Sequence, residues 1–345
     1  MDRPRVGLKD VAQLAGVSVK TVSNVVNGYV HVTPATRIRV EAAIKELNYR
    51  PNLTARNLRQ GRTGIIALAV PELDIPYFAE LARFVVAAAE QRGLTVLIDQ
   101  TGATREREQL VAEGFRAHLI DGVIFSPLAL SSDDLAAIWE APSTTASPIP
   151  TVLLGERVHD GPADHIAVDN VAAAKEATLH LAALGRRRIA AVGAQDDAAA
   201  ETSRLRLEGY RLALKEAGLP RDDRLVVPVE AYHRADGAQA MAELLDSGAA
   251  PDAAFCFNDL LALGALRTLL ERGHSVPGDV ALAGFDDIED GRYATPTLTT
   301  ISPDKRAIAR RAVDLLADRL AKGPLVAARE IEVPYRLVVR ESTGG

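Results

Sequence analysis

Short apolar runs alternate with longer amphipathic segments from residue 64 onward. The runs have the length of strands, and the segments between most of them carry apolar residues at helical spacing. This alternation predicts open parallel sheets covered by helices, with ligand sites at the carboxyl ends of the strands. About 280 residues are enough for two such lobes with a cleft between them. The predicted strands are "GIIALAV", "LTVLIDQ", "DGVIFSP", "TVLLGE", "RRIAAVGA", "RLVVPV", "AAFCFND" and "VALAGFDD".

The N-terminal part of the chain follows a helical pattern instead. A short helix is predicted over "LKDVAQLAG", ending at Gly16, where a left-handed turn favours glycine. Ser18 would cap a second helix over 18–27, and Thr33-Pro34 would open a third. Two short helices joined by a glycine-containing turn form a helix-turn-helix. The residues expected to face inward from the first helix are Leu8, Val11, Ala12, Leu14 and Ala15.

Charge is distributed unevenly along the 345 residues. Residues 1–62 contain eleven Lys/Arg and four Asp/Glu, a net charge of +7, which leaves −13 for the rest of a chain with −6 overall. A basic head on an acidic remainder indicates that the head binds a polyanion. A surface that is merely rich in arginine is the alternative that charge alone leaves open.

The second predicted helix has polar side chains on its outer face and at its N-terminal end. A helix of this kind, lying in the major groove of DNA, brings such side chains to phosphates and base edges. A three-helix bundle with an ordinary polar surface is the alternative, although it would not require the positive charge. The predicted DNA contacts on this helix are Ser18, Val19, Lys20, Thr21, Ser23 and Asn24.

The segment "NYRPNLTARNLRQGRTG" places apolar residues among arginines. Asn52 can cap a short helix there, and an isolated helix of this length is marginal in water. Binding in the minor groove would order it, with Leu58 inserted as a wedge between base steps. A plain basic linker is the alternative.

These motifs resemble the lac repressor / galactose repressor family of bacterial transcription regulators, over essentially the whole chain. The resemblance implies an all-α helix-turn-helix head and an α/β, two-lobed core domain like that of periplasmic binding proteins, with two doubly wound parallel sheets. In this interpretation "TPTLTTI" and "AAREIEV" are later crossings between the lobes. The implied boundaries are 1–50 for the DNA-binding domain, 51–63 for the hinge helix and linker, 64–345 for the effector-binding and dimerisation core, 64–168 with 299–327 for its first lobe, and 169–298 with 328–345 for its second.

In the head, the resemblance makes 18–27 the recognition helix. Asn52 would start the hinge helix, Ala55 would be its minor-groove alanine and Leu58 its intercalating leucine. Asn24 stands where arginine is common, and asparagine prefers adenine whereas arginine reads guanine, so the bases outside the operator's centre stay open. The family implies a pseudo-palindromic double-stranded DNA operator with a central C·G step, which a homodimer would read.

Polar and aromatic side chains follow several of the predicted strands. Together they can hydrogen-bond a polyhydroxy ligand and stack on its ring, although each one alone could equally cap a helix or solvate a loop. The resemblance assigns effector anchoring to Arg206, a sugar contact to Asn258, an acidic ligand contact to Asp286 and a stacking aromatic to Tyr232, with His233 as its alternative. The predicted effector-binding residues are Asp74, Tyr77, Phe78, Ser126, Glu156, Arg206, Tyr232, Asn258 and Asp286.

The chain lacks several motifs that are typical of catalytic, phosphate-binding and metal-binding sites. No phosphate-binding glycine loop, nucleophile elbow or Cys/His ligand spacing occurs, so we expect no enzyme, no cofactor and no metal site. The single cysteine, Cys256, suits a reducing cytosol and is expected in an apolar core. The N-terminus lacks a secretory apolar region, and no apolar run is long enough to span a bilayer, which predicts a cytoplasmic protein without a membrane partner.

These observations favour a dimeric repressor that a sugar or a related small carbohydrate releases from its operator. The effector would change how the two lobes sit and thus whether both hinge helices form on DNA. A regulator with a nucleobase or another metabolite as co-repressor is one alternative. A solute-binding protein without a regulatory role is the other, and the missing export signal counts against it.

Overall fold

The computed structural model describes residues 6–26, 29, 31–49, 62–114, 119–140, 149–156, 161–195, 200–323 and 327–345. The chain forms two compact units, Met1–Thr63 and Gly64–Gly345. We call the first unit the head and the second the core domain, and we describe each by itself.

The head is built from three short helices, α1 (Leu8–Ala15), α2 (Val19–Val26) and α3 (Pro34–Glu46). Each helix contributes a fully buried valine to one small hydrophobic core, and these are Val11, Val22 and Val40. The helix-turn-helix expected from the apolar spacing is therefore present.

The ends of these helices lie where the sequence predicted them. Gly16 ends α1 with φ +63° and ψ +39°, the left-handed conformation that glycine adopts without a Cβ penalty. The Ser18 hydroxyl accepts a hydrogen bond from the Thr21 amide at 3.1 Å, and Thr33 accepts one from Thr36 at 3.4 Å. Local capping chemistry thus sets the boundaries of α2 and α3.

Leu14 does not face inward as expected, because its side chain is 44% exposed. Consecutive residues on an α-helix are rotated by about 100°, so Leu14 lies off the stripe that Val11 and Ala15 bury. The apolar stripe of α1 is narrower than its composition suggested.

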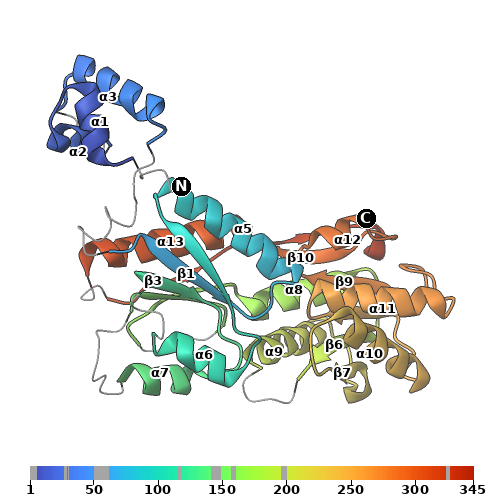
Figure 1. The fold of residues 1–345 in the computed structure, drawn as a ribbon. Coiled ribbons are helices and arrows are strands. Elements are labelled where there is room, and N and C mark those ends of the chain that lie inside the picture. Colours follow the sequence, from blue (N-terminus) through green and yellow to red (C-terminus); the bar gives the residue numbers. More distant parts are fainter. Residues whose placement is uncertain are drawn as a thin grey trace. The chain divides into compact units, whose positions relative to one another are not determined.

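The first lobe of the core domain contains a six-stranded parallel sheet in the order β11-β5-β4-β3-β1-β2. In β1, Ile66 and Leu68 pack in one hydrophobic cluster, whereas Ala67 and Ala69 pack in another on the opposite face. Helices cover both faces, with α5 and α13 on one and α6 and α7 on the other (Figure 1). The elements are β1 (Ile65–Val70), β2 (Thr95–Gln100), β3 (Gly122–Phe125), β4 (Thr151–Leu154), β5 (Asp164–Ala167), β11 (Glu330–Glu332), α5 (Pro76–Gln91), α6 (Arg105–Ala112), α7 (Ser132–Glu140) and α13 (Lys305–Lys322).

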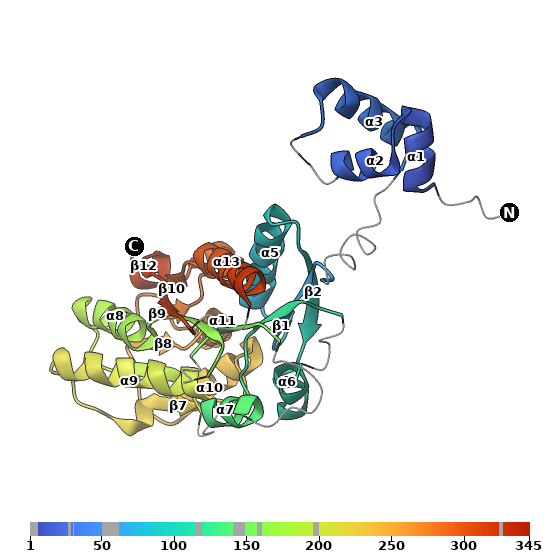
Figure 2. The ribbon, with the colours of Figure 1, turned by 90° about the vertical axis from the view of Figure 1, so that its left-hand side faces the viewer.

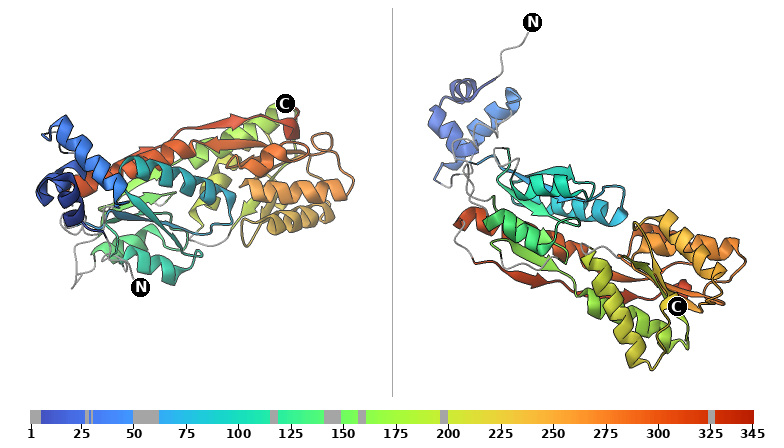
Figure 3. Two further views of the ribbon diagram at one scale, coloured as in Figure 1. Left: turned by 45° about the horizontal axis from the view of Figure 1, so that its top comes forward. Right: turned by 90° about the horizontal axis from the view of Figure 1, so that it is seen from below.

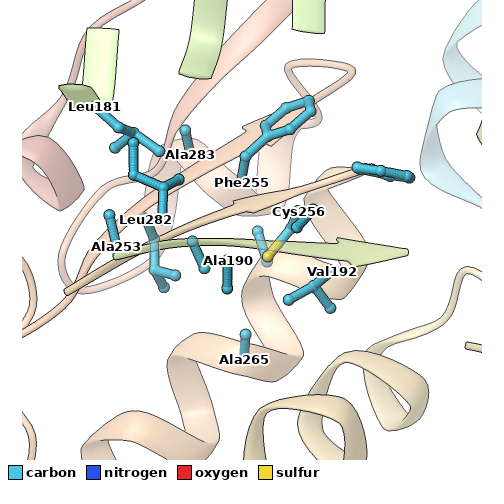
Figure 4. Close-up of a cluster of buried hydrophobic side chains, with 14 of the residues drawn as sticks. Leu181, Ala190, Val192, Ala253, Phe255, Cys256, Ala265, Leu282 and Ala283 are labelled. Carbon is cyan, nitrogen blue, oxygen red and sulfur yellow. The ribbon is translucent and has the colours of Figure 1, made fainter. Parts of the chain in front are cut away.

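The second lobe contains a six-stranded sheet in the order β12-β10-β9-β8-β6-β7, parallel except for the edge pair β10–β12. Cys256 lies fully buried in its hydrophobic core, as expected from the apolar run around it. Its side chain is on the same side of the sheet as Val192, whereas Phe255 points to the other side (Figure 4). The elements are β6 (Ile189–Ala194), β7 (Val226–Pro228), β8 (Ala253–Cys256), β9 (Ala281–Phe285), β10 (Thr299–Pro303), β12 (Tyr335–Val338), α8 (Asn170–Ala183), α9 (Glu201–Glu216), α10 (Arg234–Asp246), α11 (Asp259–Glu271), α12 (Glu289–Tyr293), and the 3-10 turns Asp223–Leu225 and Glu341–Thr343.

The chain passes between the lobes after β5, β10 and β11. We expected 299–327 in the first lobe and 328–345 in the second, but β10 pairs with β9 of the second sheet and β11 pairs with β5 of the first. Helix α13 returns to the first lobe, where it lies beside α5 (Figures 2 and 3). The apolar pattern of a strand does not state which strand it pairs with, so these two lobe boundaries were wrong.

Strand β5 was not predicted, because it begins with the polar pair Asp164 and His165. Asp164 is fully buried and accepts hydrogen bonds from Arg319 Nε at 2.6 Å and Arg329 Nη2 at 3.1 Å. Two arginines from distant parts of the chain thus compensate the buried charge. In the described part of the chain, no helix is both long and apolar enough to span a bilayer.

Candidate functional site

A cavity of about 640 Å³ opens where the carboxyl ends of the strands of the two lobes meet. Eight of the predicted effector residues line it, and they come from both lobes. They are Tyr77, Phe78, Ser126, Glu156, Arg206, Tyr232, Asn258 and Asp286.

Asp74 does not line the cavity, contrary to the prediction. It lies exposed in the turn between β1 and α5, and Glu72 from the same turn lines the cavity instead. The direction of a side chain in an irregular turn depends on the turn's backbone, which residue types do not specify here.

Arg206 on α9 is 7% exposed and fixed in place by its surroundings. Its Nε donates to Asn170 Oδ1 at 2.8 Å, and its Nη1 donates to the carbonyl of Phe257. The guanidinium lies over the ring of Phe285, 3.6 Å from the centroid. These contacts orient the guanidinium before any ligand arrives and use part of its donor capacity.

Glu156, which follows β4 in the first lobe, is hydrogen-bonded to the second lobe. Its Oε1 accepts from Asn170 Nδ2 at 2.8 Å and its Oε2 accepts from the Thr202 hydroxyl at 2.7 Å. Asn170 therefore bridges Glu156 and Arg206 within the cavity wall. Asn170 was not among the predicted residues. It follows β5, and this strand was not predicted because it begins with polar residues.

Asp286 follows β9 with φ +111°, a conformation that a residue with a Cβ rarely adopts. Burial raises the pKa of its carboxyl to about 6, an effect that Arg206 and Lys305 reduce and Glu156 increases. Among the described residues, none donates a hydrogen bond to these carboxyl oxygens in the structure. The group is an acceptor that a ligand's donors can use.

Three aromatic side chains contribute to the wall. Tyr77 and Phe78 meet edge to face, with ring centroids 5.2 Å apart and planes at 81°. The Tyr232 hydroxyl donates to the carbonyl of Gly193 at 2.7 Å, and burial raises its pKa to about 12. Burial also raises the pKa of Tyr77. Both phenols thus stay protonated at neutral pH. The Tyr232 proton is donated to Gly193, so Tyr77 is the phenol of this pair that can donate to a ligand.

His233, the alternative to Tyr232, lines the cavity as well. Its Nε2 lies 3.3 Å from Oε2 of Glu72, so this pair joins the second lobe to the first. Asn258 also has two roles, because its Oδ1 caps α11 by accepting from the Leu261 amide at 2.8 Å while its side chain lines the cavity. The capping and ligand-binding interpretations of Asn258 are compatible.

In the head, the side chains of α2 that were predicted to contact DNA differ in their exposure to solvent. Ser18, Val19 and Lys20 are exposed, whereas Thr21, Ser23 and Asn24 are partly buried. The hinge residues Asn52, Ala55 and Leu58 lie outside the described residues. Within the described ranges, no cluster of three or more His, Cys, Asp or Glu could hold a metal ion.

Comparison with known proteins matches residues 7–52 to the bacterial regulatory proteins of the lacI family and 178–343 to the periplasmic binding protein-like domain. The ribose operon repressor of Escherichia coli is 35% identical over 335 residues, covering 97% of this chain and 99% of that protein. The chain is similar to CelR in complex with cellobiose (34% identity, TM-score 0.70, 99% and 100% coverage). It is also similar to the lac repressor dimer bound to operator and an anti-inducer (31% identity, TM-score 0.81, 99% coverage of both chains). These relatives are transcription regulators.

Proposed function

Because this chain belongs to the lacI family of bacterial regulatory proteins, we propose that it is a repressor whose homodimer binds a pseudo-palindromic operator and is released by an uncharged sugar. The observation that carries the proposal is the presence of a helix-turn-helix and a polar, partly aromatic cavity in one chain. The related CelR binds cellobiose, and the related lac repressor dimer binds operator DNA. Such a regulator works in the cytoplasm, where the DNA is.

The charges around the cavity support an uncharged ligand. The carboxyl groups of Glu72, Glu156 and Asp286 line it, whereas Arg206 already donates to Asn170 and Phe257. Among the described lining residues, the carboxyl groups outnumber the single guanidinium of Arg206, so a phosphate or carboxylate would meet an excess of like charge. Hydroxyl groups of a ligand can donate to Asp286 and accept from Tyr77, which favours a neutral polyol.

The alternative, a nucleobase co-repressor, would use the aromatic side chains of the cavity, Tyr77, Phe78 and Tyr232, for stacking. A base is commonly held between parallel rings, but Tyr77 and Phe78 meet edge to face. They offer no slot in which a base could stack between them. Together with the polar lining around Asp286 and Glu156, this geometry leads us to propose a sugar rather than a nucleobase, bound without turnover.

Selection of DNA by the purified full-length protein, followed by gel-shift assays, tests the proposal. We expect one duplex to be retarded and D-ribose, cellobiose or a related neutral sugar to release it. Hypoxanthine and ribose 5-phosphate serve as controls for a nucleobase and for an anionic sugar. Failure to retard any duplex would favour a solute-binding protein, and a duplex retained only with hypoxanthine would favour a co-repressor mechanism.

A further inference from the structure

Lys305 is a buried lysine behind the cavity that no role described so far uses. Its side chain is 6% exposed, and it does not line the cavity. The Nζ atom lies 2.6 Å from the carbonyl oxygen of Asp286, 3.1 Å from that of Asp287 and 2.7 Å from Oε2 of Glu80. An ammonium group has three N–H donors, so these three acceptors use all of its hydrogen-bonding capacity.

The position of Lys305 in its helix is unfavourable on local grounds. It is the first residue of α13, where the partial positive charge of the helix dipole disfavours a cation. Lysine is also rarely buried unless its charge is paired. Local helix chemistry therefore does not account for a lysine here, whereas its three tertiary contacts do.

Those contacts join the two lobes. Glu80 lies on α5 and Lys305 on α13, both in the first lobe, whereas Asp286 and Asp287 follow β9 in the second. The other hydrogen bonds of this turn come from the second lobe: Asp259 accepts from the Ile288 amide at 2.9 Å. The Lys305 ammonium thus links the turn to the opposite lobe.

The backbone of this turn has an unfavourable conformation, although its amides are hydrogen-bonded within the second lobe, that of Asp286 to Ile301 and that of Ile288 to Asp259. Asp286 and Asp287 have φ values of +111° and +50°, a region that residues with a Cβ rarely adopt. Hydrogen bonds from an ammonium to both carbonyls stabilise this conformation, which places the Asp286 carboxyl at the cavity.

We propose that Lys305 is a positioning residue that holds the Asp286–Asp287 turn of the second lobe against α5 of the first lobe. Tyr77 and Phe78 in the first turn of α5 line the same cavity, and Glu80 follows one turn later. A ligand that moves Asp286 therefore also acts on α5 through Lys305 and Glu80. This coupling rests on the proposed function, because Asp286 is taken to contact the effector.

Hydrogen–deuterium exchange on the full-length, ligand-free protein tests the link without any ligand. Lys305→Met keeps the apolar stem and removes the donors, so exchange of the amides at 286–288 should become about tenfold faster. Lys322→Met is the matched control, since it removes an exposed lysine of the same helix whose partner Asp318 lies 3.5 Å away. This control should exchange at the wild-type rate over 286–288.

A second measurement tests whether the Lys305 charge acts on the Asp286 carboxyl across the lobe boundary. In protein labelled with ¹³C at the aspartate carboxyls, the signal that is lost in Asp286→Asn identifies this group, and its titration is followed by NMR. The wild-type midpoint is expected near pH 6, because burial raises the pKa to about 6 while Lys305 lowers it. Lys305→Met should shift the midpoint to higher pH, and Lys322→Met should leave it unchanged.

An unchanged value of either measurement in folded Lys305→Met would overturn the proposal. If that variant does not fold, Glu80→Gln decides, since it removes the carboxylate that pairs with the Lys305 ammonium and so weakens the link to α5. Faster exchange at 286–288 in Glu80→Gln then supports the link, and wild-type exchange overturns it. Gel shifts with D-ribose and cellobiose report separately on the proposed function, whose failure would leave the exchange and titration results valid.

Discussion

Asp286 combines a left-handed backbone with a carboxyl group whose pKa burial raises to about 6. Both features cost free energy. None of the described residues donates a hydrogen bond to the carboxyl oxygens of Asp286. Strain and desolvation of this kind persist where the surrounding structure enforces them, often at binding sites. At the residue scale, Asp286 is the group whose protonation should most affect ligand binding.

Sugar affinity should therefore depend on pH. Hydroxyl groups of a ligand donate to the ionised carboxylate, which becomes protonated as the pH falls through about 6. Affinity should be constant above about pH 7 and fall by up to about tenfold per pH unit below the midpoint. Calorimetric titration of the releasing sugar between about pH 5 and 8 measures this. Asp286→Asn should bind weakly at every pH, and a flat profile for the wild type would contradict the assignment.

At the scale of elements, α11 connects the second lobe's packing to its ligand site. Its N-cap is Asn258, which lines the cavity, and Gly264 in its middle packs against α10. A Cβ on Gly264 would lie 1.9 Å from the carbonyl oxygen of Arg234. The two helices can approach this closely only because that position lacks a side chain.

Gly264→Ala should therefore destabilise the protein, although alanine is the better helix former. Because the clash is with backbone, α11 must shift, and we expect a loss of about 2–3 kcal/mol in the free energy of unfolding. Urea denaturation measures the effect. Arg267→Ala, at an exposed position of the same helix, serves as control and should change stability by less than about 0.5 kcal/mol. Equal stability of the two variants would refute the packing argument.

At the scale of the whole molecule, a head of charge +7 accompanies a remainder of charge −13. The two parts should respond differently to salt. DNA binding by the head releases counterions from the phosphates, whereas a neutral sugar in the cavity displaces none. The charge division thus allows the two proposed binding activities to be separated experimentally.

Raising the salt concentration from about 50 to 200 mM should weaken operator binding by about a thousandfold. Over the same range, sugar affinity should change by less than about twofold, since screening acts little on an uncharged ligand. Fluorescence anisotropy with labelled operator and calorimetry with the sugar provide the two values. A sugar affinity that falls together with operator affinity would indicate a charged ligand and contradict the proposed one.

Local chemistry allowed much of this molecule to be predicted. Gly16, Ser18 and Thr33 set the ends of the head's helices through interactions with neighbours in sequence. Most strands of the core domain appeared as apolar runs because both faces of a parallel sheet are buried. Eight of the nine predicted effector residues line the cavity, since parallel strands bring their carboxyl ends to one edge.

Other features depend on partners that are distant in sequence. Strand β5 begins with Asp164, whose buried charge is acceptable only because Arg319 and Arg329 reach it. The lobe boundaries near 303 and 333 follow from strand pairing. The direction of the Asp74 side chain depends on the backbone of the turn in which it lies. The contacts of Lys305, with Glu80 and with the carbonyls of Asp286 and Asp287, likewise join segments that are not neighbours in sequence.

The sequence by itself determined the helix-turn-helix, the alternating core domain and the kinds of side chain at the strand ends. These follow from periodicity and capping, which act over a few residues. Only the tertiary structure decided which strands pair, that Asn170 joins Glu156 to Arg206, and that Lys305 holds the turn of Asp286 against α5. These contacts join segments far apart in the chain, and their energies depend on burial that only the folded lobes create.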